Sequence, residues 1–345
     1  MGIIRRKHRS ILSVVLEIIF ILVILLIMFI VFKLFQIPKA DIPADAVITN
    51  DLSEKTEQNL EDYQNIALFG VDSRENELKQ NTRSDTIMVA SINKKTKEVK
   101  LVSIYRDTYV YIDNEHGYNK INHAYSYGGP ELAINTINQN FDLNITDFIT
   151  VNFNSLAEIV DALGGVTIDI QKDEIKEVNR YTKDVAKILD KKGGKIKEAG
   201  SQKLNGVQAT AYCRVRKTSG GDYRRSERQR AVLSAIVDEV KKANPIKLLS
   251  IINTVFPHIY TSLSVKDILF MAPGAFSYKL VSTEGFPFEK EGRTVNKTSY
   301  VFPLKSLDEN VSKLHKHLFG TKKYSPSSQV KSYSKKISQV YSTGK

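Results

Sequence analysis

Short apolar runs bounded by turn residues recur along the middle of the chain and predict β-strands. The run at residues 64–70 has the length and the flanking turn residues of a buried strand. Residues 86–92 and 99–104 form two more such runs, and the polar turn between them predicts a hairpin. Further strands are expected at residues 148–153, 166–170, 277–282 and 299–302.

Apolar residues spaced three and four apart predict helices between these strands. Residues 155–163 carry such a stripe, with Asn154 expected as the N-cap, and a longer stripe runs through residues 226–243. Further helices are expected at residues 130–138, where Pro130 would be the first helical residue, at 246–255, 265–271 and 307–318, and on the surface within 171–200. Hairpins mixed with strand–helix–strand units predict an α/β fold with a central mixed sheet flanked by helices.

A local cluster of positive charge lies at residues 212–230, which hold seven Arg or Lys residues and two acids. Residues 209–216 are predicted to form a strand, on which Arg214 and Arg216 would share one face because side chains two apart point the same way. Cys213 alternates with them and would face the core, which makes it a poor candidate for a nucleophile. The strand would therefore have one cationic face and one apolar face.

A helix is expected to begin after the Gly-Gly pair at residues 220–221. Its first turns hold Arg225, Arg228 and Gln229, and the N-terminus of a helix itself favours anions. Together with the predicted cationic strand, this helix start is suited to bind a multiply charged phosphate.

The N-terminal segment predicts a membrane anchor. Residues 1–10 are basic, and the apolar run at residues 11–33 is long enough to cross a hydrocarbon core of roughly 30 Å at about 1.5 Å per residue. A cleaved signal peptide is the alternative, but the apolar run is too long for one and no small-residue cleavage site follows it. The basic residues place the N-terminus in the cytoplasm and the remainder of the chain outside the membrane.

Composition divides the remainder of the chain into three parts. Residues 34–63 are polar and contain two prolines, which predicts a stalk or loosely packed lead-in. Residues 64–320 are expected to form one catalytic domain. Residues 321–345 are rich in Lys, Ser and Tyr, contain no acidic residue, and are expected to be a disordered tail. The tail is either simply solvated or holds the protein against an anionic polymer.

The net charge of +12 lies mostly at the two ends of the chain. Without residues 1–10 and 321–345 the body carries only about +2, so it lacks the broad positive surface of a nucleic-acid-binding protein. The single cysteine excludes an internal disulfide, and no Cys/His spacing resembles a zinc site. Any metal is therefore expected to be a hard cation held by oxygen ligands.

Two aspartates lie at the ends of neighbouring predicted strands. Asp72 follows the first strand and Asp85 precedes the second, so an antiparallel pairing of these strands would bring both carboxylates together. Such a pair suits Mg²⁺, which binds one or two carboxylates together with substrate phosphates. The alternative is that both are turn residues bonded to backbone or to Arg83, and spacing alone leaves both interpretations open.

Two further cations follow the next strand. Arg106 lies just beyond residues 99–104, and Lys120 follows a short distance along the chain. A surface salt bridge is the simpler interpretation for each residue alone. The accumulation of several cations and two carboxylates at strand ends favours a functional site.

The order of these motifs resembles the LytR-CpsA-Psr family. The resemblance covers roughly residues 64–245. It is carried by the segments 69–74, 83–86, 106–108, 120–122, 161–166, 214–216 and 222–229. Each motif alone is weakly specific, but their combination in this order is highly specific.

The resemblance implies a membrane-anchored phosphotransferase of a Gram-positive-type bacterium. It would transfer a glycopolymer, such as a teichoic acid or capsule, from an undecaprenyl-pyrophosphate carrier to peptidoglycan and form a phosphodiester. It also implies the family fold, with a hydrophobic tunnel for the polyprenyl tail. Two alternatives remain: a non-catalytic receptor for polyprenyl phosphates or anionic wall polymers, and a membrane-tethered transcriptional regulator, although the expected topology places the arginines outside the cytoplasm.

The resemblance also assigns roles by motif. Asp72 and Asp85 would hold Mg²⁺, or Mn²⁺, and would act in catalysis with Arg83 and Arg106. The pyrophosphate would be bound by Arg83, Arg106, Lys120, Arg214, Arg216, Arg225 and Gln229.

Two positions depart from the family pattern. Tyr105 stands where proline is usual, and Arg224 stands where glycine is usual. The second departure leaves open whether Arg224 or Arg225 reaches the phosphates. The base that deprotonates the acceptor hydroxyl also stays open among Asp72, Asp85 and Asp107.

Overall fold

The structure is a computed structural model of the 345-residue chain. It describes residues 42–73, 78–79, 81–244, 258–263 and 277–344, together with the single positions 21, 24, 25, 28, 29, 31, 32, 35, 40, 247, 251, 254, 255 and 267.

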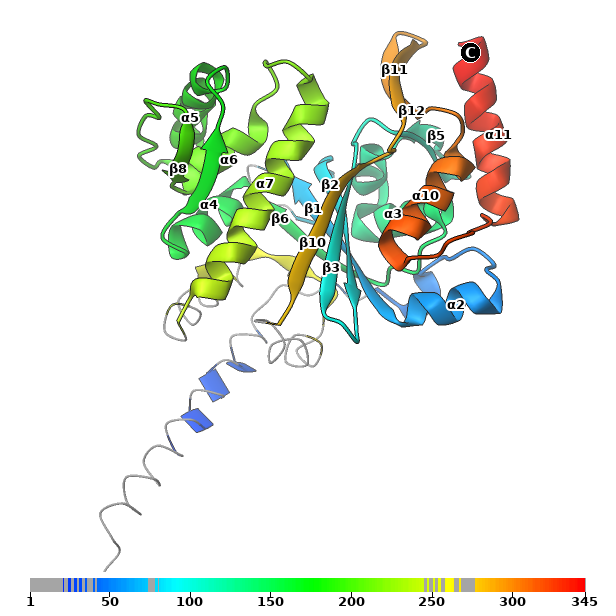
Figure 1. The fold of residues 1–345 in the computed structure, drawn as a ribbon, viewed down its shortest axis with the longest axis horizontal. Helices are drawn as coiled ribbons and strands as arrows, with labels where there is room; N and C mark the ends of the chain where they lie inside the picture. The colour runs from blue at the N-terminus through cyan, green and yellow to red at the C-terminus, as the bar shows by residue number, and fades with distance from the viewer. Residues whose placement is uncertain are drawn as a thin grey trace, which may run out of the picture.

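A six-stranded mixed sheet forms the centre of the molecule (Figure 1). Its strand order is β10-β3-β2-β1-β6-β9. The β1–β2, β2–β3 and β6–β9 pairs are antiparallel, whereas β1–β6 and β10–β3 are parallel. The strands are β1 Tyr63–Val71, β2 Ser84–Asn93, β3 Glu98–Ile104, β6 Asp147–Asn152, β9 Tyr260–Thr261 and β10 Lys279–Phe286. The predicted mixed sheet, including the β2–β3 hairpin, is confirmed.

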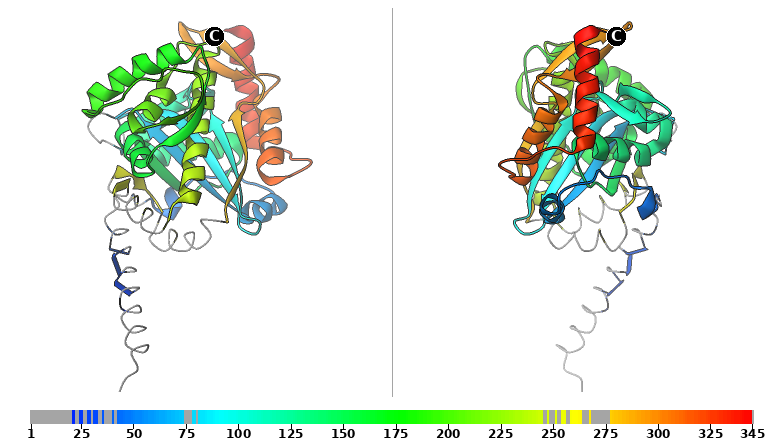
Figure 2. Two further views of the ribbon diagram at one scale, coloured as in Figure 1. Left: turned by 60° about the vertical axis from the view of Figure 1, so that its left-hand side comes forward. Right: turned by 90° about the vertical axis from the view of Figure 1, so that its right-hand side faces the viewer.

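Helices cover the sheet in two groups, which Figures 1 and 2 show on opposite sides. One group surrounds the main hydrophobic core and consists of α2 Glu54–Glu61, α3 Asn122–Phe141, α10 Leu307–Phe319 and α11 Ser328–Thr343. The other group forms a separate lobe with its own core and consists of α4 Phe153–Ala162, α5 Ile175–Leu189, α6 Gly206–Arg214 and α7 Gly221–Lys242.

The two faces of the sheet contact different helices because successive side chains of a strand point to opposite faces. Ile87 and Val89 of β2 belong to the main core with α3. Met88 and Ala90, which alternate with them, pack with Leu233 of α7. Helix α7 therefore crosses the face opposite to the main core (Figure 1).

Smaller elements complete the fold. Three two-stranded sheets pair β4 Tyr109–Asp113 with β5 Gly117–Lys120, β7 Val166–Ile170 with β8 Gly200–Leu204, and β11 Lys290–Val295 with β12 Thr298–Pro303. A short 3₁₀ helix, η1, spans Ala44–Ala46.

The periodicity located most helices but misplaced one cap. Helix α4 is capped by Asn152, whose side chain accepts the Ser155 N–H at 2.9 Å, so the predicted cap at Asn154 is wrong. Helix α3 is longer than predicted, and its backbone is non-helical at Gly128 and Gly129, so that Pro130 opens its second segment as expected. The helices predicted at residues 246–255 and 265–271 lie mostly outside the described residues.

The predicted strand at residues 209–216 is wrong, because this segment forms most of helix α6. The Asn205 side chain accepts the Gln208 N–H at 2.9 Å and the Gln208 side chain accepts the Asn205 N–H, which closes a capping box. Every residue from Gly206 to Cys213 is buried between α4, α5 and α7, so the segment has no polar face that would reveal the helical period.

The predicted disordered tail is also wrong. Helix α11 occupies residues 328–343 and begins at Ser327, whose hydroxyl accepts the Val330 N–H at 3.1 Å. Val330, Tyr333, Ile337 and Val340 are buried in the main core and lie on one side of the helix. A narrow stripe of apolar side chains is enough to pack this helix against the main core, although the segment is otherwise polar.

Residues 42–63, the described part of the predicted lead-in, belong to the folded domain rather than to a stalk. Leu60 of α2 is buried, and the Ala40 N–H donates to the Thr261 carbonyl at 2.9 Å. Asn50 donates to Asp142 at 2.7 Å. The predicted domain boundaries at 64 and 320 are therefore too narrow at both ends.

The anchor predicted at residues 11–33 lies largely outside the described residues. The described positions between 21 and 35 are helical, and most of them carry large apolar side chains that are exposed. Within the part of the chain that the structure describes, no helix is both long enough and apolar enough to cross a membrane.

Candidate active site

The ends of β1 and β2 bring the two predicted carboxylates to one cavity. Gly70 pairs with Thr86 and Val71 pairs with Ser84, so Asp85 is the extra residue of a β-bulge. The strands approach closely here, since a Cβ on Gly70 would lie 2.8 Å from the Thr86 Cβ. Asp72, the first residue after β1, and Asp85 both line a cavity of about 180 Å³.

Three guanidinium groups surround Asp85. Arg106 follows β3 and donates from Nη1 to Asp85 Oδ1 at 2.6 Å. Arg216, in the loop after α6, donates from Nη2 to Oδ2 at 2.9 Å. Nη1 of Arg225, in the first turns of α7, lies 3.6 Å from the same Oδ2. Three separate segments of the chain therefore converge on one carboxylate.

Asp222 is a second anion in this cluster. Its carboxylate lies 3.5 Å from Arg106 Nη2, 3.5 Å from Arg216 Nε and 3.3 Å from Arg225 Nη1. The motif reasoning included Asp222 only as part of a matching segment and gave it no role. The available signal was an acid two residues before the Arg224–Arg225 pair.

The charges of the cluster shift the proton affinities of its members. Burial would raise the pKa of the Asp85 carboxyl, but the charges of Arg225, Arg106 and Arg216 outweigh burial and hold this pKa below its usual value. Burial lowers the pKa of Arg225 to about 10, against the opposing attraction of Asp85. Arg225 is only 2% exposed, and its Nε and Nη1 have no hydrogen-bond partner among the described residues. The site therefore contains guanidinium N–H groups that form no hydrogen bond with its own carboxylates.

Buried contacts fix the loop that carries Arg216. Arg228 donates to Glu174 Oε1 at 2.8 Å, to the Val215 carbonyl at 3.1 Å and to Thr218 Oγ1 at 2.6 Å. The side chains of Arg228 and Glu174 are 2% and 1% exposed. Arg228, which the sequence placed among the phosphate-binding residues, therefore holds the loop in place and does not face the cavity.

The structure distinguishes between Arg224 and Arg225. Arg224 points away from the cavity and pairs with Glu227 at 2.9 Å, with 43% of its side chain exposed. Arg225 lines the cavity beside Asp85. Adjacent residues of a helix point about 100° apart, so only one of the two can face the site.

Two more of the predicted ligands reach the cavity. Arg214 ends α6, lines the cavity, and stacks its guanidinium over the Phe153 ring at 4.7 Å. Gln229 lines the cavity one turn after Arg225. The predicted strand geometry for Arg214 and Arg216 was wrong, but both side chains arrive at the same cavity.

Three of the predicted cations, Arg106, Lys120 and Arg83, do not line the cavity. Lys120 pairs with Asp107 at 3.0 Å, and Asp107 lies 3.8 Å from Arg106, so Lys120 adjoins the cluster through one carboxylate. Arg83 is exposed and does not line the cavity. The pKa of His123 is lowered by burial and by the nearby charges of Arg83 and Lys120, which places Arg83 on the His123 side of the site.

Cys213 is buried, as predicted from its position in the sequence, and it also contributes to the lining of the arginine cavity. Burial raises the pKa of its thiol to about 12, so the thiol stays protonated near neutral pH. Nucleophilic catalysis by Cys213 is therefore not supported.

The carboxylates fit a metal ion only together with a substrate. Within the described residues, no group of three or more His, Cys, Asp or Glu side chains is arranged to hold a metal. Asp72 and Asp85 share the cavity, but both Asp85 oxygens also accept hydrogen bonds from arginines. Mg²⁺ commonly binds one or two carboxylates and completes its ligand shell with phosphate oxygens and water, and the pair fits this arrangement.

The chain is similar to several known proteins. The LytR_cpsA_psr family model matches residues 31–316. The chain is 33% identical over 233 residues to the polyisoprenyl-teichoic acid–peptidoglycan teichoic acid transferase TagT of Bacillus subtilis, covering 66% of this chain and 69% of the relative. It is 34% identical over 223 residues to TagU of Enterococcus faecalis, covering 64% and 68%.

A solved structure of a family protein has the same fold. The protein YwtF (TagT) with bound octaprenyl pyrophosphate lipid matches with a TM-score of 0.57 at 27% identity, covering 76% of this chain and 92% of that chain. The family match spans most of the domain, including every element that forms the arginine cavity. The chain therefore belongs to the LytR_cpsA_psr family.

Proposed function

We propose that the chain is a phosphotransferase that moves an anionic glycopolymer from a polyprenyl-pyrophosphate carrier to peptidoglycan. The observation that carries this proposal is the convergence of Arg106, Arg216 and Arg225 on the Asp85 carboxylate. Asp85 lines a small cavity together with Asp72, Arg216 and Arg225. Arginine binds phosphate oxygens through two parallel hydrogen bonds, so the cavity suits a pyrophosphate. The names of the relatives support the same donor and acceptor.

The reaction needs charge stabilisation more than covalent help. The acceptor hydroxyl oxygen forms a bond to the polymer-bearing phosphorus, the bridging P–O bond of the pyrophosphate breaks, and polyprenyl phosphate leaves. Negative charge builds up on the bridging oxygen and on the transferred phosphoryl group. Fixed guanidinium groups in a cavity stabilise this charge without reorganising during the reaction. Arg225, held by burial, and Arg106, held between Asp85 and Asp222, are placed for this role.

The hydroxyl proton must pass to a base. Asp85 is poorly suited, because its pKa is held below the usual value by three arginines. Asp107, paired with Lys120, and Asp72, exposed at the cavity edge, are the better candidates. Asp107→Asn separates them: if Asp107 is the base, this variant retains substrate binding and loses the rising limb of the pH–rate profile. An unchanged rising limb would leave Asp72 as the base.

Asp72 and Asp85 are the proposed ligands of Mg²⁺ in the substrate complex. When bound, the ion neutralises charge on the phosphate oxygens. Transfer is expected to stop on addition of a chelator and to return with Mg²⁺, and Asp72→Asn is expected to raise the Mg²⁺ concentration needed for half-maximal rate. Full activity in the chelator would contradict the assignment.

Residues 11–33 are proposed to anchor the domain outside the membrane. The exposed apolar side chains at the described positions from 21 to 35 support this proposal, because such surfaces are normally covered by a partner or a membrane. A reporter that is active only outside the membrane, fused to the C-terminus, should be active with the full chain. An inactive fusion would instead favour a cytoplasmic domain.

The decisive experiment is a transfer assay. The full chain in detergent is mixed with a polyprenyl-pyrophosphate-linked glycan, peptidoglycan and Mg²⁺, and transfer is measured by attachment of label to the peptidoglycan. Arg106→Ala is expected to lose transfer, whereas Arg180→Ala, which removes an exposed arginine paired with Glu177 on α5, should retain it. No transfer by the wild type, or equal transfer by Arg106→Ala, would contradict the proposal.

A further inference from the structure

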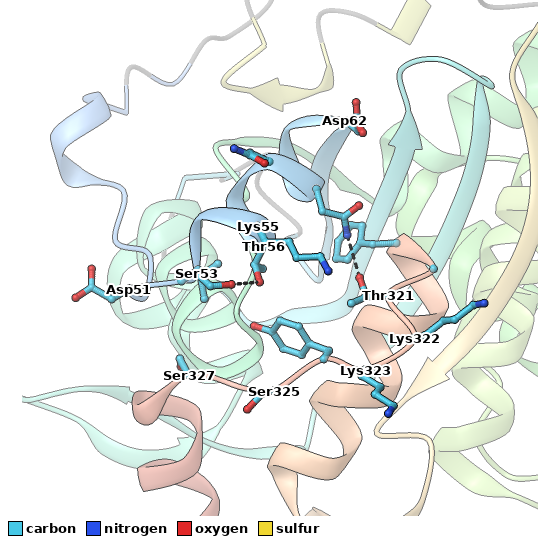
Figure 3. A pocket seen from close by; sticks show the side chains of 16 residues that line it. Asp51, Ser53, Lys55, Thr56, Asp62, Thr321, Lys322, Lys323, Ser325 and Ser327 are labelled. Atoms are coloured by element: carbon cyan, nitrogen blue, oxygen red, sulfur yellow. Dashed lines mark hydrogen bonds between the residues drawn. The ribbon is translucent and has the colours of Figure 1, made fainter.

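A second hollow lies at the opposite end of the sheet from the arginine cavity. It has a volume of about 1030 Å³ and is formed by α2, the end of α10 and the connection to α11 (Figure 3). Asp62, which directly precedes β1, lines this hollow, whereas Asp72, which directly follows β1, lines the arginine cavity. The nine residues of β1 separate the two by roughly 25–30 Å.

The hollow is pre-formed by contacts between segments far apart in the sequence. Asn59 of α2 donates to Thr321 Oγ1 at 2.9 Å, which joins the two walls. Tyr324 stacks on buried His315, with ring centroids 3.6 Å apart, and donates its hydroxyl to Asp142 at 2.8 Å. A ligand would therefore meet a fixed surface and would not have to order it.

Three lysines and two aspartates line this hollow, which gives it a small excess of positive charge. Lys55, Lys322 and Lys323 are exposed, and none of the three forms an ion pair with a residue that the structure describes. Figure 3 shows the Lys55 side chain directed towards Thr321, while the side chains of Lys322, Asp51 and Asp62 lie at the edges and point outwards. Asp62 is also paired with Lys95 at 2.8 Å. Lysine is a mobile point charge that suits successive phosphates better than one rigidly held group.

The remaining lining is rich in hydroxyl and amide groups. Ser53, Thr56, Ser325 and Ser327 supply hydroxyls, and Asn59 supplies an amide. No lining residue is an exposed large apolar side chain, so the hollow lacks the inserting groups expected of a membrane-binding surface. Positive charge combined with many hydroxyls matches a flexible, hydroxylated chain that carries phosphodiesters.

We propose that this hollow binds a segment of the anionic wall polymer, apart from the arginine cavity, and keeps that polymer at the enzyme. The identity of the polymer rests on the proposed function. The binding of an anionic polymer in the hollow does not depend on the reaction in the arginine cavity, because the two share no residue. A chain of several repeats can occupy the hollow while chemistry proceeds at the other end of the sheet.

The test uses a fluorescent poly(glycerol phosphate) chain without lipid carrier, titrated with the full chain in uncharged detergent. Lys322→Ala/Lys323→Ala is expected to weaken binding roughly five- to tenfold, with weaker salt dependence than the wild type. The matched control is Lys183→Ala/Lys187→Ala, which removes two exposed lysines from α5 and is expected to bind like the wild type. A neutral dextran is expected not to bind.

Further measurements distinguish a polymer-binding hollow from the other possible roles of this surface. Arg216→Ala is expected to lose transfer yet keep this binding; binding that depends on Arg216 and not on Lys322 and Lys323 would overturn the proposal. Equal losses in the two double variants would overturn it as well. If anionic phospholipid vesicles bind with this lysine dependence and the polymer does not, the hollow is a membrane contact. Lysine-dependent polymer binding without any transfer by the wild type would refute the proposed function and leave the hollow as a polymer site.

Discussion

Asp85 and its arginines act at the scale of single residues by holding one another in place. The carboxylate accepts hydrogen bonds from two guanidinium groups and lies near a third, so its position fixes three donors at once. The donors are then already grouped when a substrate phosphate arrives. Such pre-organisation is the main way in which an enzyme stabilises a developing negative charge.

Arg225→Ala tests this arrangement directly. We expect the transfer rate to fall by about 10²–10³-fold, because the variant removes a buried positive charge from the cavity. The matched variant Arg224→Ala removes an exposed guanidinium paired with Glu227 and should change the rate by less than about threefold. Rates in the transfer assay decide the matter, and the opposite ranking would show that Arg224 contacts the phosphates.

The buried Arg228–Glu174 pair predicts a different signature. Arg228→Met leaves the Glu174 carboxylate buried without its partner, so we expect the free energy of unfolding to fall by about 3–5 kcal/mol. The double variant Arg228→Met/Glu174→Met should be more stable than either single variant, since no unpaired charge remains. Urea unfolding measures both effects. Additive losses in the double variant would show that the two side chains do not stabilise each other.

At the scale of elements, the sequence predicted the strands and helices whose apolar residues recur at a regular spacing. It missed the elements that lack such a spacing. The strands β1, β2 and β3 appeared as bounded apolar runs, and their pairing brought Asp72 and Asp85 together as expected. Helix α6 is buried all around, so its helical period could not be seen. Asp222 and Glu174 were missed because their roles depend on contacts with residues of other elements. Arg83 belongs to a matching motif, yet the fold places it outside the cavity.

Helix α11 provides a test at this scale. Ile337 is 1% exposed in the main core, so Ile337→Ala is expected to lower the free energy of unfolding by about 2–4 kcal/mol. Lys336→Ala, on the exposed side of the same helix, should change it by less than about 0.5 kcal/mol. Thermal or urea unfolding measures the difference. Equal stability of the Ile337 variant and the wild type would restore the interpretation of residues 321–345 as a disordered tail.

At the scale of the whole molecule, a buried histidine links three segments. His315 of α10 donates from Nε2 to the Phe141 carbonyl at the end of α3, at 3.0 Å, and stacks on Tyr324. Its side chain is fully buried, and burial lowers the pKa of the imidazole to about 4. The folded protein therefore keeps this imidazole neutral at a pH where the unfolded chain protonates it.

The sign of the resulting pH dependence follows from this difference. Between about pH 6.5 and about pH 4 the unfolded chain binds the extra proton, so stability falls as the pH falls through this window. His315 alone should account for about 2 kcal/mol between about pH 7 and about pH 5. The variant His315→Gln should lose that part of the slope while keeping contributions from other histidines. Parallel stability–pH curves for variant and wild type would contradict the assignment.

The docking of α11 also has a consequence for the order of events in the cell. The ribosome makes residues 328–343 after all the other helices and strands of the described domain, and yet they complete the same core as β1 and α3. Strand β3 likewise cannot pair with β10 until β10 has been made, and β10 follows β3 by more than 170 residues. The core of the domain therefore stays incomplete until both of these later segments have been made. A polypeptide released before that point leaves the apolar side chains of the core exposed.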